Sequence, residues 1–288
     1  MKHRIHLAIA AALGAAAMAL LLSVATPLAG QAPAYRAPRA PDGHPDLNGL
    51  WQALNTANYD IQTHVARPAM ATRPGPFGPV PVREVLALGA VGAVPPGMGI
   101  VDGNVIPYKA AAAEQRKKNQ DGWLTLDPEI KCYLPGVPRA TYMPYPFQIF
   151  QSTKALFIAY EYAGATRNIY LQDPGPAPVD SWMGQSVGRW DGETLVVDAK
   201  GFNDQTWFDR SGNFHSDQLH VVERYTRTSP DVISYEATIE DPATFTRTWK
   251  ISMPLYRHQE KGAQLMDFKC VEFVEELIYG QWRKAPLR

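Results

Sequence analysis

Several features that would place this chain in a common functional class are missing from its sequence. Charged residues make up only 19% of the 288 residues, and 28 basic side chains balance 28 acidic ones. A chain with so little charge and no net charge is not expected to bind nucleic acid or to adhere to an anionic membrane through a basic patch. We therefore expect no nucleic-acid partner and, once any leader is removed, no membrane partner.

Motifs for cofactors and metals are missing as well. The sequence has no P-loop, no dinucleotide-binding glycine fingerprint and no Gly-x-Ser-x-Gly elbow. His215 and His220 are five residues apart, which is neither the strand nor the helix spacing of a metal-ligand pair. Nucleotide enzymes and common serine hydrolases are thus excluded, and we expect no cofactor and no bound metal.

Cysteine is nearly absent, and the two residues present indicate a compartment. Cys132 and Cys270 are too few for a structural zinc site of the usual kind, and neither lies in a Cys-His signature. An oxidising compartment favours a disulfide between them. Closing a loop of ~140 residues would contribute about 4–5 kcal/mol in the chain-entropy model. We predict this disulfide.

The N-terminus has the pattern of an export signal. A short basic start precedes residues 5–25, which are almost wholly Ala, Leu, Ile, Met and Val, and small residues suited to cleavage follow. Residues 1–30 are interpreted as a cleaved signal peptide. An uncleaved anchor is the alternative, because about 20 apolar residues span a bilayer. The expected location is periplasmic or secreted.

Short β-branched and aromatic runs dominate the second half and predict a mainly β fold. Two of them are joined by Asp191-Gly192, a strong signal for a tight hairpin. Eight or nine strands without intervening helices favour an antiparallel up-and-down meander. Closure into a lipocalin-like barrel would remove the exposed edges, and a β-sandwich is the alternative. The expected strands are 147–151, 155–162, 166–171, 186–190, 194–199, 218–227, 232–240, 244–253 and 264–271.

The first half is irregular and rich in Pro and Gly. Residues 31–45 are expected to be an extended or mobile Pro-rich linker. Residues 46–145 are expected to wrap the barrel, with a first strand at 46–52 and one short helix at 108–120. Residues 146–288 then form the barrel domain.

Two sets of motifs carry resemblances. Gly49-Leu50-Trp51 on the first strand resembles the Gly-x-Trp of lipocalins. The longer stretches are PDLNGLWQ at 45–52, PGVPR at 135–139, EY at 161–162, SVGRWDGETLVVD at 186–198, GFND at 201–204, HS at 215–216, VER at 222–224 and TIEDP at 238–242. Together they resemble a widespread group of exported bacterial proteins of unassigned function. This resemblance covers most of the chain after the leader; it implies export and supplies no activity.

A polar stretch at 201–217 is the densest candidate for a functional site. It is rich in Asp, Asn, Trp and His and lies between two expected strands, where the loops of a barrel mouth contact ligands. His215 suits a general base near neutral pH, with Asp204 or Asp209 orienting its imidazole. The alternative is that the Asp, Asn and Ser side chains only form turns in a surface loop.

Adjacent opposite charges interrupt the expected strand at 218–227. Because side chains alternate between the two faces of a strand, Glu223 and Arg224 point to opposite sides, so one of them enters the lumen unless it lies at a rim. A buried carboxylate suits acid/base chemistry, and Arg224 would stabilise an anion. A cross-strand ion pair, such as Glu223 with Arg247, is the alternative.

Tyrosine and arginine side chains supply further candidates. Tyr160 and Tyr162 share one face of an expected strand and would line an apolar cavity, although tyrosines also pack in ordinary sheet cores. Arg139 would clamp a ligand carboxylate or pair with one of the protein's own acids. The expected substrate-binding residues are Tyr160, Tyr162, Trp207, Phe214 and Arg139.

The leading functional hypothesis is a cofactor-independent enzyme that acts on a small, largely apolar or aromatic molecule inside the barrel. Hydrolysis, elimination and isomerisation by proton transfer are all compatible with it. The expected catalytic groups are His215, Asp209, Asp204, Glu223 and Arg224. A periplasmic carrier of the lipocalin type is the first alternative. An envelope interaction module, with a closed lumen and an exposed apolar patch, is the second. The oligomeric state stays open.

Overall fold

The structure is a computed structural model that describes residues 35–67, 72–81 and 93–274. The expected signal peptide at 1–30 lies outside these residues.

Contacts divide the chain into two compact units, Met1–Arg36 and Ala37–Arg288, and the second contains the elements described here. Its strands are β1 (Gly49–Gln52), β2 (Thr72–Gly75), β3 (Gly78–Pro81), β4 (Phe147–Gln151), β5 (Ala155–Tyr160), β6 (Thr166–Tyr170), β7 (Gln185–Asp191), β8 (Thr194–Lys200), β9 (His220–Ser229), β10 (Val232–Glu240) and β11 (Trp249–Arg257). Its helices are η2 (Asp102–Asn104), α3 (Ala110–Asp121), α4 (Trp123–Leu126), η3 (Pro128–Lys131), α5 (Arg139–Tyr142) and η4 (Tyr162–Gly164).

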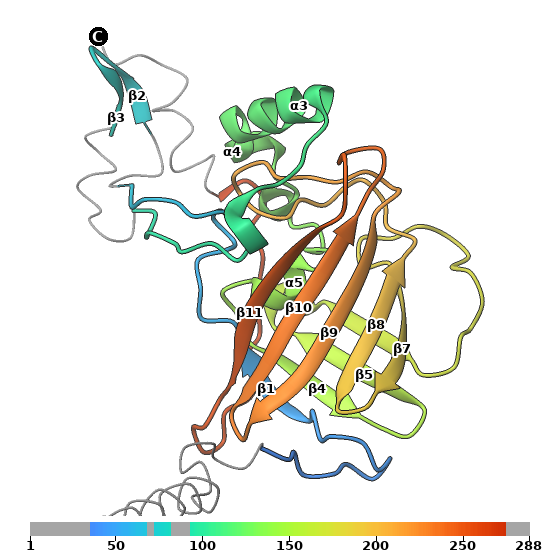
Figure 1. The fold of residues 1–288 in the computed structure, drawn as a ribbon. Helices are drawn as coiled ribbons and strands as arrows, with labels where there is room; N and C mark the ends of the chain where they lie inside the picture. The colour runs from blue at the N-terminus through green and yellow to red at the C-terminus, as the bar shows by residue number, and fades with distance from the viewer. Residues whose placement is uncertain (1–34, 68–71, 82–92, 275–288) are drawn as a thin grey trace, which may run out of the picture. The chain divides into compact units, whose positions relative to one another are not determined.

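Nine of the described strands form a closed barrel (Figure 1). Their order around the wall is β1-β11-β10-β9-β8-β7-β6-β5-β4, and β4 pairs back to β1. Along β10 and β11 every second residue is buried, as expected where alternate side chains enter the interior. The predicted mainly β fold with a lipocalin-like barrel is therefore confirmed, and the closure excludes a sandwich.

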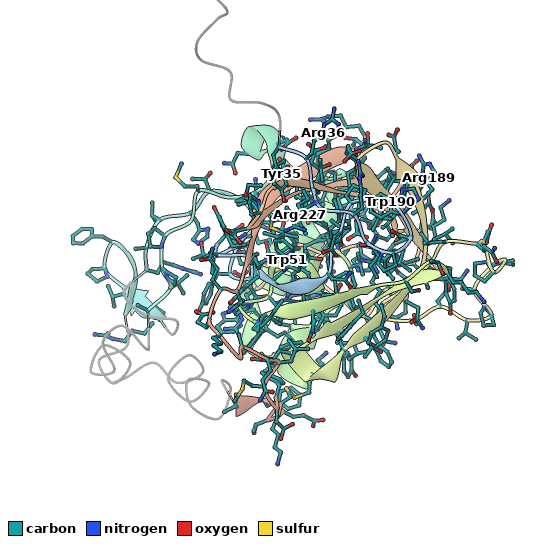
Figure 2. The ribbon with its side chains drawn as sticks, turned by 90° about the horizontal axis from the view of Figure 1, so that it is seen from below. Tyr35, Arg36, Trp51, Arg189, Trp190 and Arg227 are labelled. Carbon is teal, nitrogen blue, oxygen red and sulfur yellow. A yellow bond between two sulfur atoms is a disulfide. The ribbon has the colours of Figure 1, made fainter. Side chains whose placement is uncertain are left out.

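The barrel closes at β1, which pairs with β11 on one side and β4 on the other. Trp51 is fully buried, and the centre of its indole ring lies 4.4 Å from the guanidinium of Arg257 and 6.0 Å from that of Arg227. Figure 2 views Trp51 and Arg227 from below. Gly49 has a φ of 142°, and a Cβ there would lie 2.5 Å from Arg257 Nη1. Glycine is thus required where the arginine crosses β1 to cover the tryptophan.

One pair of the described barrel strands departs from the antiparallel pattern. β6 and β7 run parallel and pair over only two positions, beginning with Ile169 and Ser186. Parallel neighbours need a connection that returns the chain to the starting end. Residues 171–184 make this return as a long loop beside β7 and β8 (Figure 1). The barrel is therefore not a pure up-and-down meander.

Two expected strands differ from the structure. The segment at 264–271 is irregular, because β1 already occupies the edge of β11 and a disulfide ties Cys270 to Cys132. β11 begins at Trp249 rather than at residue 244. Asp241 Oδ1 accepts a hydrogen bond from the backbone N–H three residues later, which holds a turn at that point.

Two segments that precede β4 in the chain, the helix α3 and the Pro-rich stretch at 37–45, are part of the compact unit. The helix expected at 108–120 is present as α3, with Gly122 as its C-cap. In the expected linker, Ala37 and Ala40 are buried, and the ring of His44 stacks on that of Trp190 with centroids 4.7 Å apart. From Ala37 onward the Pro-rich stretch is therefore part of the compact unit.

Side chains fill the barrel interior. Inward-facing residues of β1, β4 to β6 and β8 to β11 belong to one buried cluster. The rings of Tyr225 and Tyr235 lie 5.0 Å apart across neighbouring strands, and a charged pair described below lies beside them. Protein side chains thus occupy the lumen.

Candidate functional site

The structure buries His215 and engages both of its ring nitrogens. Nε2 lies 2.6 Å from Thr206 Oγ1, and Nδ1 lies 2.8 Å from the carbonyl oxygen of Ser216. Because a carbonyl only accepts, Nδ1 donates, and Nε2 accepts from the threonine hydroxyl. Burial lowers the pKa of His215 below its usual value, which favours the neutral ring. Both nitrogens are therefore committed inside the protein.

Neither of the two carboxylates expected to orient His215 accepts a hydrogen bond from its ring, although the charge of Asp204 acts on the ring and favours its protonated form. Asp209 is fully buried and accepts hydrogen bonds from the backbone N–H groups of Ile61 and Ser211, at 2.8 and 2.9 Å. Asp204 is exposed. Since the described hydrogen bonds of His215 go to neither carboxylate, the polar loop folds on itself and forms no His–Asp pair.

Two aromatic residues expected at the substrate site stabilise the same loop. Trp207 and Phe214 form an antiparallel bridge, and the ring of Phe214 stacks on Tyr108 at 6.0 Å. Neither residue lines any of the four pockets described below. Their packing gives the loop its shape.

Glu223 is the charge that enters the barrel, and its partner is Arg167 on β6. Arg167 Nη1 donates to Glu223 Oε1 at 3.1 Å, and Nη2 donates to Oε2. The hydroxyls of Tyr225 and Tyr235 also donate to Oε1, at 2.9 and 2.8 Å. Arg224 points outward, where its Nη2 lies 3.1 Å from an Asp191 oxygen. The pair expected with Arg247 is not formed, because Arg167 reaches the carboxylate across the lumen.

Tyr160 and Tyr162 do not share a face. β5 ends at Tyr160, whose hydroxyl is buried in the barrel beside Arg167 and Thr141. Tyr162 lies in η4, and its hydroxyl donates to the carbonyl oxygen of Glu129 at 3.1 Å. The turn after β5 therefore sends the second tyrosine outside the barrel wall.

Arg139 pairs with the protein's own acids, in a cluster beside α5. Its Nη1 lies 3.0 Å from Asp127 Oδ1, and its Nη2 lies 2.6 Å from Glu129 Oε2. Its Nε donates to Asn58 Oδ1 at 2.9 Å. All four side chains are buried or nearly so. Of the two roles expected for Arg139, the structure shows the internal ion pair.

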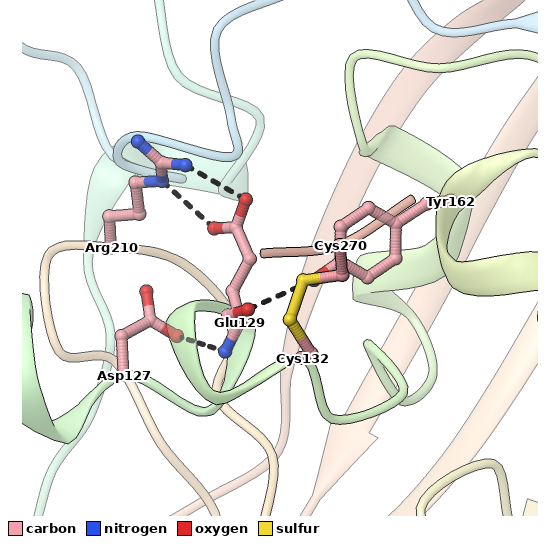
Figure 3. Close-up of a disulfide and its surroundings, with 6 residues drawn as sticks. All are labelled: Asp127, Glu129, Cys132, Tyr162, Arg210 and Cys270. Carbon is pink, nitrogen blue, oxygen red and sulfur yellow. Dashed lines mark hydrogen bonds and ion pairs between the residues drawn. A yellow bond between two sulfur atoms is a disulfide. The ribbon is translucent and has the colours of Figure 1, made fainter. Parts of the chain in front are cut away.

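Arg210 supplies a second cation to this cluster (Figure 3). Its Nε and Nη2 lie 2.8 and 2.9 Å from the two oxygens of Glu129. Burial opposes ionisation of Glu129, but the guanidinium groups of Arg210 and Arg139 outweigh it and lower its pKa to about 2. At Asp127, burial outweighs the attraction of Arg139, so the pKa of Asp127 is raised. Glu129 is therefore an anion at any physiological pH.

A buried charge cluster of this kind is a candidate functional site. Removing charged groups from water costs several kcal/mol per ion, which a buried pair only recovers through good geometry. Clusters with strongly shifted pKa values gather at functional sites. The cluster of Asp127, Glu129, Arg139 and Arg210 is the strongest such group outside the lumen that the described residues contain.

A pocket of about 240 Å³ lies against this cluster, and we call it the aromatic pocket. Its aromatic wall consists of Tyr145, Tyr162 and Phe268, and its charged lining residues are Glu129, Arg210 and Lys269. Two of these six residues belong to the cluster. An apolar wall beside a few placed polar groups is the usual composition of a small-molecule site.

The predicted disulfide builds one side of the aromatic pocket. Cys132 and Cys270 are joined, with their Cα atoms 5.7 Å apart, and Cys270 itself lines the pocket (Figure 3). We call residues 264–274 the strap. The backbone N–H of Phe273 donates to the Ile130 carbonyl oxygen at 2.8 Å, which fixes the strap beyond the disulfide. Phe268 is thereby held in the wall.

Three larger pockets lie away from the buried charge cluster. The largest, about 620 Å³, lies between the 171–184 loop and β8 and is lined mainly by exposed or half-exposed residues. A second, about 360 Å³, lies on the outer face of β6. The third, about 320 Å³, is formed by residues 54–57 and 96–100. None of these three touches the buried charge cluster.

Sequence reasoning missed most of this site. Asp127, Glu129 and Phe268 lie in segments without a recognisable motif, and Arg210 lies in the polar stretch whose His and Asp residues drew attention. The predicted disulfide could have pointed to this site, because it brings the residues next to Cys132 close to the residues next to Cys270. Charged and aromatic residues in both flanks then become neighbours.

The described residues offer no other obvious route to a functional class. No group of three or more metal-ligating side chains comes together among them. Within the same part of the chain, no helix has the length and apolar character needed to cross a membrane. No family model, curated protein or solved structure matches this chain. The geometry of the site must therefore carry the functional argument.

Proposed function

We propose that this protein binds a small, largely apolar or aromatic molecule in the aromatic pocket and does not transform it. The observation that carries the proposal is the contact between a ring-lined pocket and a buried, preorganised charge cluster. Such a site provides an apolar surface for a ring and fixed charges for orientation. Its size suits a ligand with a single ring.

Binding is favoured over proton transfer because the groups near the pocket lack a suitable proton acceptor. Glu129 has a pKa of about 2, so it is a weak base, and both of its oxygens already accept hydrogen bonds. Burial raises the pKa of Tyr162, so its hydroxyl stays protonated. His215 is fully engaged elsewhere. A general base needs a pKa near the working pH and reach to its substrate.

The proposal includes export, as the sequence pattern at 1–30 and the resemblance to exported bacterial proteins suggest. The disulfide supports it, because such bonds persist in oxidising compartments and are rare in the cytosol. A periplasmic or secreted binding protein would act on molecules that reach the cell envelope.

Ligand-observed NMR with benzyl alcohol tests the binding site. This neutral probe has one ring and is expected to bind the wild-type protein weakly and saturably. Phe268→Ala removes part of the aromatic wall and should weaken binding about tenfold, since one ring contact contributes roughly 1–1.5 kcal/mol.

Phe157→Ala is the matched control, because Phe157 is an exposed aromatic residue on β5, outside the pocket. It should leave binding unchanged. Equal loss in both variants, or no binding to the wild type, would contradict the proposal. The second outcome would favour an interaction module, for which the exposed side chains of Leu54, Val65 and Met98 offer apolar surface.

A further inference from the structure

The pocket of about 360 Å³ beside β6 lies where the barrel wall departs from the antiparallel pattern, and we call it the return-loop pocket. One wall is β6, and the other consists of residues 177–185, which lead back to β7 (Figure 1). Each wall contributes one large aromatic side chain, Tyr170 from β6 and Trp182 from the returning segment. The volume lies within the range of about 300–1,000 Å³ that small-molecule sites occupy.

The β6 wall has an unpaired backbone edge in this pocket. The N–H of Tyr160 donates to the carbonyl oxygen of Ala165 at 2.8 Å, so Ala165 directs its backbone groups toward β5. Because this direction alternates along a strand, the next residue, Thr166, directs its N–H and C=O away from β5. The pairing of β6 with β7 begins only at Ile169, so Thr166 has no strand partner on that side in the described part of the chain. A single free residue is too short an edge for an added strand, which usually has at least about three residues, but it offers a donor and an acceptor to a small ligand.

The polar side chains of the return-loop pocket are uncharged and free to bind. The side chains of Thr166, Asn168 and Ser181 form no hydrogen bond among the described residues. Gln185 Nε2 donates to the carbonyl oxygen of Gly175 at 2.5 Å, which leaves the amide oxygen of Gln185 as an acceptor. The pocket therefore presents hydroxyl and amide groups of both hydrogen-bonding kinds.

No free charge lines the return-loop pocket among the residues that the structure describes. Arg167 is the one charged residue of this lining, and both terminal nitrogens of its guanidinium are bound to Glu223 in the lumen. Asp173 and Asp180 line the neighbouring pocket beside β8 rather than this one. An ion would lose hydration here without gaining a counter-charge. The lining therefore suits a neutral ligand.

The Trp182 wall is held in place by contacts on both sides of it in the chain. The backbone N–H of Ser181 donates to the Gly201 carbonyl oxygen at 2.9 Å, and its own carbonyl oxygen accepts from the N–H of Asn203 at 3.0 Å. The ring of Trp182 lies 5.7 Å from that of Tyr133, which is next to the disulfide. A wall that is fixed before binding reduces the entropy that a ligand must offset.

We propose that the return-loop pocket binds a neutral sugar through one pyranose ring. The C–H groups on one face of the ring pack against the aromatic ring of Trp182. The hydroxyls of the sugar exchange hydrogen bonds with Thr166 and Asn168. A purely apolar ring would leave these polar groups dehydrated and unpaired, which costs free energy, whereas a pyranose has both an apolar face and a hydroxyl rim. This second site goes beyond the proposed function and does not depend on the aromatic pocket.

Saturation-transfer NMR on the oxidised protein tests the sugar site, with the methyl glycosides of glucose, galactose, mannose and N-acetylglucosamine as probes. At least one of these neutral sugars should bind weakly and saturably. Trp182→Ala should weaken its binding about tenfold, because the stacking face is lost. Thr166→Val removes a hydroxyl from an exposed position of β6 and keeps a β-branched side chain, so it should weaken binding about two- to fivefold without affecting the fold.

Two matched controls change the same residue types elsewhere on the barrel. Tyr256→Ala removes an exposed aromatic ring from β11, and Thr228→Val removes an exposed hydroxyl from β9; both should leave glycoside binding unchanged. Phe268→Ala should also leave it unchanged, because the two pockets share no lining residue. The sugar site is overturned if no glycoside binds, or if Thr166→Val binds as tightly as its control; a folded Trp182→Ala with wild-type affinity has the same consequence. In each of these cases benzyl alcohol binding still decides the proposed function separately.

Discussion

Asp209 is the residue whose ionisation most directly affects stability. It is fully buried, and the carboxylate of Asp60 lies close enough to act on it. Burial and then this second carboxylate raise the pKa of Asp209 from 3.8 to about 7. The folded state therefore binds the Asp209 proton more tightly than the unfolded chain does. The resulting stabilisation is complete below about pH 4 and is lost as the pH rises through 7.

We predict that the free energy of unfolding falls between pH 5 and pH 8. Asp209 contributes up to about 3 kcal/mol to this decrease, because its pKa of about 7 lies two units above pH 5 and each unit is worth roughly 1.4 kcal/mol. Asp60→Asn removes the neighbouring charge and should reduce the decrease. Urea denaturation at pH 5 and at pH 8 measures the decrease in the free energy of unfolding. Glu114→Gln, at an exposed site on α3, should leave the slope unchanged. An equal slope in wild type and Asp60→Asn would show that Asp60 does not act on Asp209.

At the scale of elements, β6 and β9 are held together across the lumen by Arg167 and Glu223. The two strands are not neighbours in the wall, and β6 has only a short parallel pairing with β7. Arg167 Nε also donates to Ser186 Oγ on β7 at 2.8 Å. The arginine thus connects three strands at the part of the wall with the least backbone pairing.

We predict that Arg167→Met lowers the free energy of unfolding by about 3–5 kcal/mol, because it leaves Glu223 charged and unpaired in the interior. Adding Glu223→Gln should recover part of this loss, since the amide oxygen still accepts from Tyr225 and Tyr235. Arg224→Met is the adjacent control and should cost less than about 1 kcal/mol, because its ion pair is exposed. Chemical denaturation compares the three. A similar loss from both arginine substitutions would contradict the role of Arg167.

At the scale of the whole molecule, the disulfide closes a long loop of the chain. Cys132 precedes β4 and Cys270 follows β11, with a separation of 138 residues. The bond therefore encloses β4 to β11 and restricts the unfolded chain over most of the barrel. It also holds the strap that completes the aromatic pocket.

We predict that the full chain expressed in a bacterium is recovered from the periplasm, cleaved near residue 31 and oxidised. Intact-mass analysis with and without reductant would show both changes. Cys132→Ala with Cys270→Ala should lower the free energy of unfolding by about 4–5 kcal/mol and weaken benzyl alcohol binding, since the strap is released. Recovery of an unprocessed, reduced chain with full stability would contradict the proposed export.

The fold was largely predictable from the sequence because its signals are local. Alternation along strands such as β9 and β10, the Asp191-Gly192 turn and the α3 helix depend on neighbours in the chain. Cys132 and Cys270 were predictable as a pair because no other cysteine is available. Glu223 and Arg224 were correctly expected to face opposite sides, but the sequence did not show which one faces inward.

The partners of those residues were decided only by the tertiary structure. Arg167 meets Glu223 because a closed barrel brings β6 and β9 across one lumen, and Arg210 meets Glu129 because a loop after β8 reaches the segment before α5. A polar side chain in a sequence does not reveal whether its hydrogen bonds are spent within the protein, as they are for His215. The sequence determined the elements and the disulfide, whereas long-range packing determined which charges are buried together and therefore where the proposed ligand would bind.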